Sequence, residues 1–129
     1  MAAIKRTQQS FRRFYIYISE RNLEQEMRER CMKHHTTLRD IYLDVRWSSV
    51  HAARLEIWWW LFSLGKSLNE IARMFDRDAA SINFAVKRLK DYANTNNVRL
   101  TLETIHDIAK GVSALKLQKL QKENRDNEQ

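Results

Sequence analysis

The chain has 129 residues and a mass of 15.5 kDa, which is enough for one domain with its own hydrophobic core. It has two glycines and no proline, which excludes Gly-rich phosphate-binding loops and disfavours all-β folds, because these need many turn residues. We therefore expect an all-α protein. The formal net charge of +7 favours an acidic partner, most simply nucleic acid, with an anionic membrane surface as the alternative.

The cysteine content and the N-terminal residues favour a cytoplasmic location, in a bacterial or phage-infected cell. Cys31 is the single cysteine, so no intramolecular disulfide can form. Lys5 and Arg6 lead into a polar stretch, which is not the pattern of a signal peptide. The longest apolar run, over 57–64, is too short to cross a bilayer, and we expect no membrane partner.

The first half of the chain shows apolar residues at helical spacing. Residues 1–22 are predicted to be an N-terminal extension, frayed over 1–10 and helical over 11–18, with a strand over 14–18 as the alternative. The residues that carry this helical spacing are Phe11, Phe14, Tyr15 and Ile18. Two further helices are predicted over 22–34 and 37–45.

The segment 49–64 is predicted to be a buried helix, because its apolar residues cover nearly every face. Ser48 or Ser49 is the expected N-cap, and Gly65 the expected stop. Within it lies a run of three tryptophans, Trp58, Trp59 and Trp60. Successive helical residues point about 100° apart, so this run must contact two or more neighbouring elements or a partner chain.

The C-terminal segment, residues 94–129, is predicted to hold a polar loop, a helix over 101–121 and a disordered tail over 122–129. The apolar stripe of this helix can cover the core or form a homodimer. The sequence is compatible with both a homodimer and a monomer. The candidate dimer contacts are the tryptophan run, Tyr15 and Leu115.

Residues 67–92 are the most informative part of the sequence. Ser67, followed three residues later by Glu70, signals the start of a short helix that runs to about Phe75. Asp78 is placed to cap a second helix, over 79–93. Two helices joined by so short a turn are the layout of a helix-turn-helix, in which the second helix enters the major groove of DNA.

The spacing of the second helix divides it into an inner and an outer face. The residues predicted to face inward are Ile82, Ala85, Val86 and Leu89. The outer face collects Ala80, Asn83, Phe84, Lys87 and Asp91, flanked by Ala79, Ser81, Arg88 and Lys90. Asn83 can pair with adenine, the alanines allow close approach and the basic residues can reach phosphates. The alternative is a helical hairpin with a solvated charged face.

The run over 65–78 resembles the C-terminal DNA-binding domain of the bacterial replication initiator DnaA, in which it reads approximately T-G-x-S-L-x-E-I-G-x-x-F-G-x-R-D-H-T-T-V. One residue is missing after Phe75. The matching residues are Ser67, Leu68, Glu70, Ile71, Phe75, Arg77, Asp78, Ser81 for Thr, Ile82 for Val, and Ala85. The stretches 37–41 and 50–54 are also similar, so the resemblance covers about residues 23–92 and defines the expected domain, 23–93.

The resemblance implies a Trp-repressor-like helical bundle that binds double-stranded DNA. By position, Arg77 and Ser81 are the implied DNA contacts of the turn and the second helix, while Ala79 and Ala80 replace residues that bear hydrogen-bond donors. By position, the basic pair that reaches the minor groove becomes His51 and either Ala53 or, with a shift of one residue, Arg54. These departures imply that the target is a different DNA sequence from the initiator's own site, or that the specificity is weaker. The ATPase module of the initiator is missing, so no nucleotide and no cofactor are expected.

The favoured function is sequence-specific DNA binding by a transcription regulator, with a phage origin as one source. The first alternative is a replication or packaging accessory of a phage or mobile element. The second is a protein-interaction module that uses the Trp-rich helix. No nucleophile and base, and no carboxylate pair, are indicated, so we do not expect an enzyme. Cys31, His34, His35 and His51 lack the spacing of a zinc site, and no metal is expected.

Overall fold

The computed structural model describes residues 6–43, 45, 47–94 and 102–110, and it is all-α, as predicted. Of these residues, 78% are helical and none lies in a strand. The helices are α1 (Gln8–Glu20), α2 (Glu24–Lys33), α3 (Leu38–Tyr42), α4 (Ser48–Ser63), α5 (Leu68–Met74), α6 (Ala79–Asn94) and α7 (Leu102–Ala109). None of them is long and apolar enough to span a membrane.

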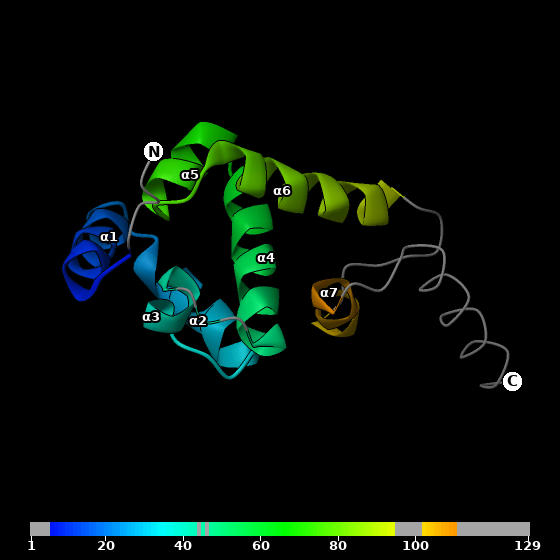
Figure 1. Ribbon diagram of the computed structural model, residues 1–129, viewed down its shortest axis with the longest axis horizontal. Helices are drawn as coiled ribbons and strands as arrows, with labels where there is room; N and C mark the ends of the chain where they lie inside the picture. The colour runs from blue at the N-terminus through cyan, green and yellow to red at the C-terminus, as the bar shows by residue number, and fades with distance from the viewer. Residues whose placement is uncertain (1–5, 44, 46, 95–101, 111–129) are drawn as a thin grey trace, which may run out of the picture.

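Helix α4 runs through the middle of the structure, and most of the other helices pack around it (Figure 1). It contacts α2 and α3 on one side, α5 and α6 at one end, and α7 on a further side. Helix α1 packs against α2 at the edge of the bundle. This central position explains why α4 is apolar on nearly every face, since each face meets a different neighbour.

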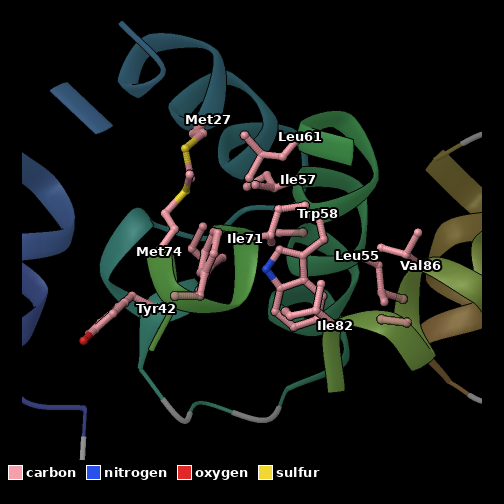
Figure 2. Close-up of a cluster of buried hydrophobic side chains, with 14 of the residues drawn as sticks. Met27, Tyr42, Leu55, Ile57, Trp58, Leu61, Ile71, Met74, Ile82 and Val86 are labelled. Atoms are coloured by element: carbon pink, nitrogen blue, oxygen red, sulfur yellow. The ribbon is translucent and has the colours of Figure 1, made fainter. Parts of the chain in front are cut away.

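The tryptophan run contacts separate neighbours, as the spacing predicts. The Trp58 ring is buried, and it lies with Ile71 and Ile82 in the core (Figure 2). Its ring centroid is 5.9 Å from that of Phe75 in an edge-on arrangement. Trp60 is half-buried on another side of α4, where the Arg30 guanidinium lies 4.2 Å from its ring centroid. Most of this aromatic surface is therefore used inside the chain.

The N-terminal extension is more ordered than predicted. Helix α1 begins at Gln8, because Thr7 and Ser10 form a capping box in which each side chain bonds the other's backbone N–H. The expected fraying is wrong for residues 7–10, and the strand alternative over 14–18 is also wrong. Phe14 and Ile18 are buried, which ties α1 to the core.

The structure agrees with the predicted caps of α4 at its C-terminal end but not at its N-terminal end. The N-cap is Trp47, which makes no side-chain capping bond, so the prediction of Ser48 or Ser49 is wrong. At the other end Gly65 has φ of +95°, and the Lys66 N–H donates to the Leu61 carbonyl at 3.2 Å. This is the predicted glycine stop, at a backbone conformation that other residues adopt with strain.

The predicted C-terminal helix is described only over Leu102–Ala109, where Ile105 and Ile108 are buried against the rest of the core. The remainder of the prediction, including Leu115 and the polar tail, lies outside the described residues.

Candidate nucleic-acid interface

Helix α6 has one buried and one exposed face. The buried residues are Ile82, Ala85, Val86, Leu89 and Tyr92. The exposed residues include Ala80, Ser81, Asn83, Phe84, Lys87, Lys90 and Asp91, while Ala79 and Arg88 are half-buried. The predicted inward stripe is therefore confirmed, and the opposite face presents small, polar and basic groups with one aromatic ring.

Asp78 caps α6, as predicted. Its Oδ1 accepts hydrogen bonds from the backbone N–H groups of Ala80, at 2.9 Å, and Ser81, at 3.4 Å. The Ser81 hydroxyl donates to Oδ2 of the same carboxylate at 3.2 Å. These bonds satisfy N–H groups that the start of a helix leaves without partners. Since the exposed side chains of the first turn, Ala80 and Ser81, are short, the backbone of another molecule can come close to it.

The basic residues of α6 differ in how freely they extend. Lys87 and Lys90 are exposed, and neither side chain forms a hydrogen bond or ion pair within the part of the chain that the structure describes. Arg88 lies along the surface instead, where its Nη2 donates to the Ile108 carbonyl of α7 at 3.0 Å. Its guanidinium carbon is 5.8 Å from the centroid of the Phe84 ring. The two lysines are therefore the side chains best placed to meet an approaching phosphate.

The turn over 75–78 is held by contacts from distant parts of the chain. Asp76 adopts a left-handed backbone conformation with φ of 51°, and the Arg77 N–H donates to the Ala72 carbonyl at 2.9 Å. The Tyr42 hydroxyl donates to Asp76 Oδ2 at 2.5 Å, and Arg6 Nη1 donates to the Asp76 carbonyl at 2.9 Å. These contacts join the turn to α3 and to the residue that precedes the cap of α1. The sequence showed no sign of them, because Arg6 and Tyr42 are far away along the chain.

Arg77 is half-buried, not extended into solvent. Its Nη2 donates to the Leu43 carbonyl at 3.2 Å, and its guanidinium carbon is 5.6 Å from the centroid of the Trp58 ring. Burial, with the nearby charges of Arg54 and Arg6, lowers the pKa of Arg77 to about 9, and the group stays charged at pH 7. The Arg77 side chain, which is predicted to contact DNA, therefore already makes contacts inside the protein that compete with a DNA contact.

Arg54, the other predicted minor-groove contact, is buried and points into the protein. The side chain is only 5% exposed. Its Nε donates to the Ile41 carbonyl at 2.7 Å, and its Nη2 donates to the carbonyls of Asp40, at 3.0 Å, and Leu43, at 2.5 Å. These carbonyls belong to the last turn of α3, where helical partners are lacking, so Arg54 joins α3 to α4.

His51 lies in the same basic region and is half-buried. Burial, followed by the charges of Arg54, Arg88 and Arg77, lowers the pKa of His51 below its usual 6.5. The imidazole is therefore neutral at pH 7, where it can accept or donate a hydrogen bond but adds no charge. Of the predicted minor-groove pair, only this uncharged member keeps part of its surface accessible.

Two other polar regions are not part of this interface. A hollow of about 390 Å³ between α1 and α5 is lined by Arg13, Tyr17, Glu70 and Arg73 among others, with charges of both signs. His106 of α7 meets His34, which follows the last residue of α2. Burial raises the pKa of the Cys31 thiol to about 12. In the described residues, no three His, Cys, Asp or Glu side chains are grouped to hold a metal ion.

Comparison of the chain with family models, curated proteins and solved structures found no match to any of them. The function must therefore be inferred from the arrangement of this chain's own residues.

Proposed function

We propose that this protein binds double-stranded DNA through a helix-turn-helix formed by α5 and α6, with α6 in the major groove, and that it regulates transcription. One observation carries the proposal: α6 buries one apolar face against α4 and α5 and leaves the opposite face exposed with Asn83 and Lys87 on it. A major groove admits one α-helix, and readout needs base-pairing groups on its outer face.

The exposed side chains divide into two roles. Asn83 carries the donor and acceptor pair that bonds adenine N7 and N6 in the major groove. Lys87 and Lys90, farther along the helix, contact phosphates on either side of the groove and hold the helix in register. The methyl groups of Ala79 and Ala80 allow the helix to approach the base edges closely.

The charges around the turn support the same orientation. Arg77 lies close enough to Arg54 and Arg6 for their charges to lower its pKa, so the three guanidinium groups repel one another. A DNA phosphate beside the turn reduces that repulsion. The net charge of +7 adds a long-range attraction for the duplex.

The experiment compares two double variants that carry the same net charge. Lys87→Ala with Lys90→Ala removes two exposed positive charges from α6, and Arg12→Ala with Arg39→Ala removes two from exposed sites on α1 and α3. We expect the α6 variant to bind duplex DNA roughly tenfold more weakly or worse, and the control variant to bind like the parent. Equal weakening in both would mean that only the total charge matters, and that α6 is not the contact surface.

The regulatory role is tested separately from DNA binding. Recovery of the DNA bound in the native cell should give fragments concentrated at promoters. Concentration at a replication origin or a packaging site would instead support the accessory role. The interaction-module alternative has less support, because Trp58 is buried and Trp59 and Trp60 are half-buried.

A further inference from the structure

Phe84 is an apolar side chain in an unexpected place. Its ring is 65% exposed, although it lies on the same helix as five buried residues. An aromatic ring left in water loses the favourable free energy of apolar burial. The exposed surface around it is polar and basic, with Asn83 one residue before and Lys87 three residues after it.

The Phe84 side chain has two neighbours on the surface of α6, Arg88 and Ala80. The Arg88 guanidinium carbon lies 5.8 Å from the ring centroid, while its Nη2 bonds the Ile108 carbonyl of α7 at 3.0 Å. One side of the ring is therefore supported by a side chain that is itself fixed to a neighbouring helix. One turn earlier Ala80 is exposed, so that Ala80 and Phe84 form a short apolar strip along the outer face.

The major groove of DNA presents one apolar group that fits such a strip. Among the four bases, only thymine presents a methyl group there, on C5, and Phe is one of the side chains that contact it. We infer that Phe84 is a specificity-determining residue that selects thymine by packing against its C5 methyl group. This inference rests on the proposed function, since it requires α6 to lie in the major groove.

The test removes the methyl group from the DNA instead of altering the protein. Duplexes that the parent enriches from a randomised library are resynthesised with uracil in place of each thymine in turn. Uracil pairs like thymine but has hydrogen at C5. At one or two positions we expect uracil to weaken binding of the parent about fourfold, the factor expected for burial of one methyl group. In Phe84→Ala, thymine and uracil duplexes should bind equally at those positions.

Lys87→Ala is the matched control, because it removes a neighbouring phosphate contact without touching the ring. It should weaken binding to both duplexes and keep their fourfold ratio. The inference is overturned if the parent binds thymine and uracil duplexes equally at every position, or if Phe84→Ala retains the preference. If the protein binds duplex DNA without this preference, only the inference about Phe84 is overturned. If the protein binds no duplex DNA at all, the proposed function is overturned as well.

Discussion

A buried guanidinium group must find hydrogen-bond acceptors inside the protein, and Arg54 has three at the end of α3. Without them, its charge would be costly to bury, and without Arg54 the carbonyls of Asp40 and Ile41 would lose this donor. Lys87 is the opposite case, because its ammonium group is exposed and lies on the proposed contact face. The two residues carry the same charge, yet one stabilises the fold and the other is available to a partner.

The change Arg54→Met keeps most of the side-chain volume but removes every donor. We expect it to lower the free energy of unfolding by about 3 kcal/mol, because the carbonyls of Ile41 and Asp40 lose this donor and the Leu43 carbonyl keeps only its bond from Arg77. Urea denaturation measures this directly. The control, Arg39→Met on exposed α3 surface, should stay within about 0.5 kcal/mol of the parent. If the two variants denature alike, the buried bonds of Arg54 do not stabilise the fold.

At the level of elements, α7 is joined to the bundle by a chain of polar groups as well as by apolar packing. His106 Nε2 lies 3.2 Å from Nδ1 of the fully buried His34, and His34 Nε2 lies 2.7 Å from Glu56 Oε2 of α4. Lys33 contacts the other oxygen of Glu56 at 2.5 Å. Burial alone would raise the pKa of Glu56, but its bonds to His34 and Lys33 lower it, so the carboxylate stays ionised.

This arrangement disfavours the protonated, charged form of the His106 imidazole. Burial lowers its pKa below the usual 6.5, and His34, Lys110 and His35 add to the effect while Asp107 opposes it. An imidazole whose pKa is lowered by folding binds its proton more readily in the unfolded chain. The contribution of His106 to the free energy of unfolding is therefore fully present above about pH 6.5 and is lost as the pH falls below that value.

We expect the free energy of unfolding to decrease as the pH falls from about 6.5 to 5.5, and amide exchange in α7 to increase over the same range. His106→Gln keeps a hydrogen-bonding group at the position but cannot titrate in this range, so its stability should change less with pH. If the pH dependence of His106→Gln equals that of the parent, His106 is not the responsible group.

At the level of the whole molecule, charge acts over a longer range than any single contact. A protein that neutralises several phosphates releases counterions of the duplex, so the logarithm of its binding constant falls linearly with the logarithm of the salt concentration. We expect steep weakening of duplex binding between about 50 and 200 mM salt, measured by titration at a series of concentrations. The slope of this logarithmic plot should become shallower by about 2 in the double variant at Lys87 and Lys90. It should stay unchanged in the variant at Arg12 and Arg39. Affinity independent of salt would exclude phosphate contacts as its source.

The amino-acid sequence was sufficient to predict most helices and the two faces of α6. The positions of Ile82 and Asn83 follow from helical spacing, and the Asp78 cap and Gly65 stop follow from residues next to them in the chain. All of these depend on neighbours within about two turns, whose relative positions the helix itself determines.

Only the tertiary structure decided which charged side chains face inward. Arg54 bonds carbonyls of another helix, Arg77 lies against Trp58, and His106 meets a histidine that is 72 positions away. The basic residues and the histidines look alike in the sequence, because residue type alone does not show what lies opposite a side chain. That depends on how the helices pack against one another, and packing brings together residues whose separation along the chain carries no periodic signal.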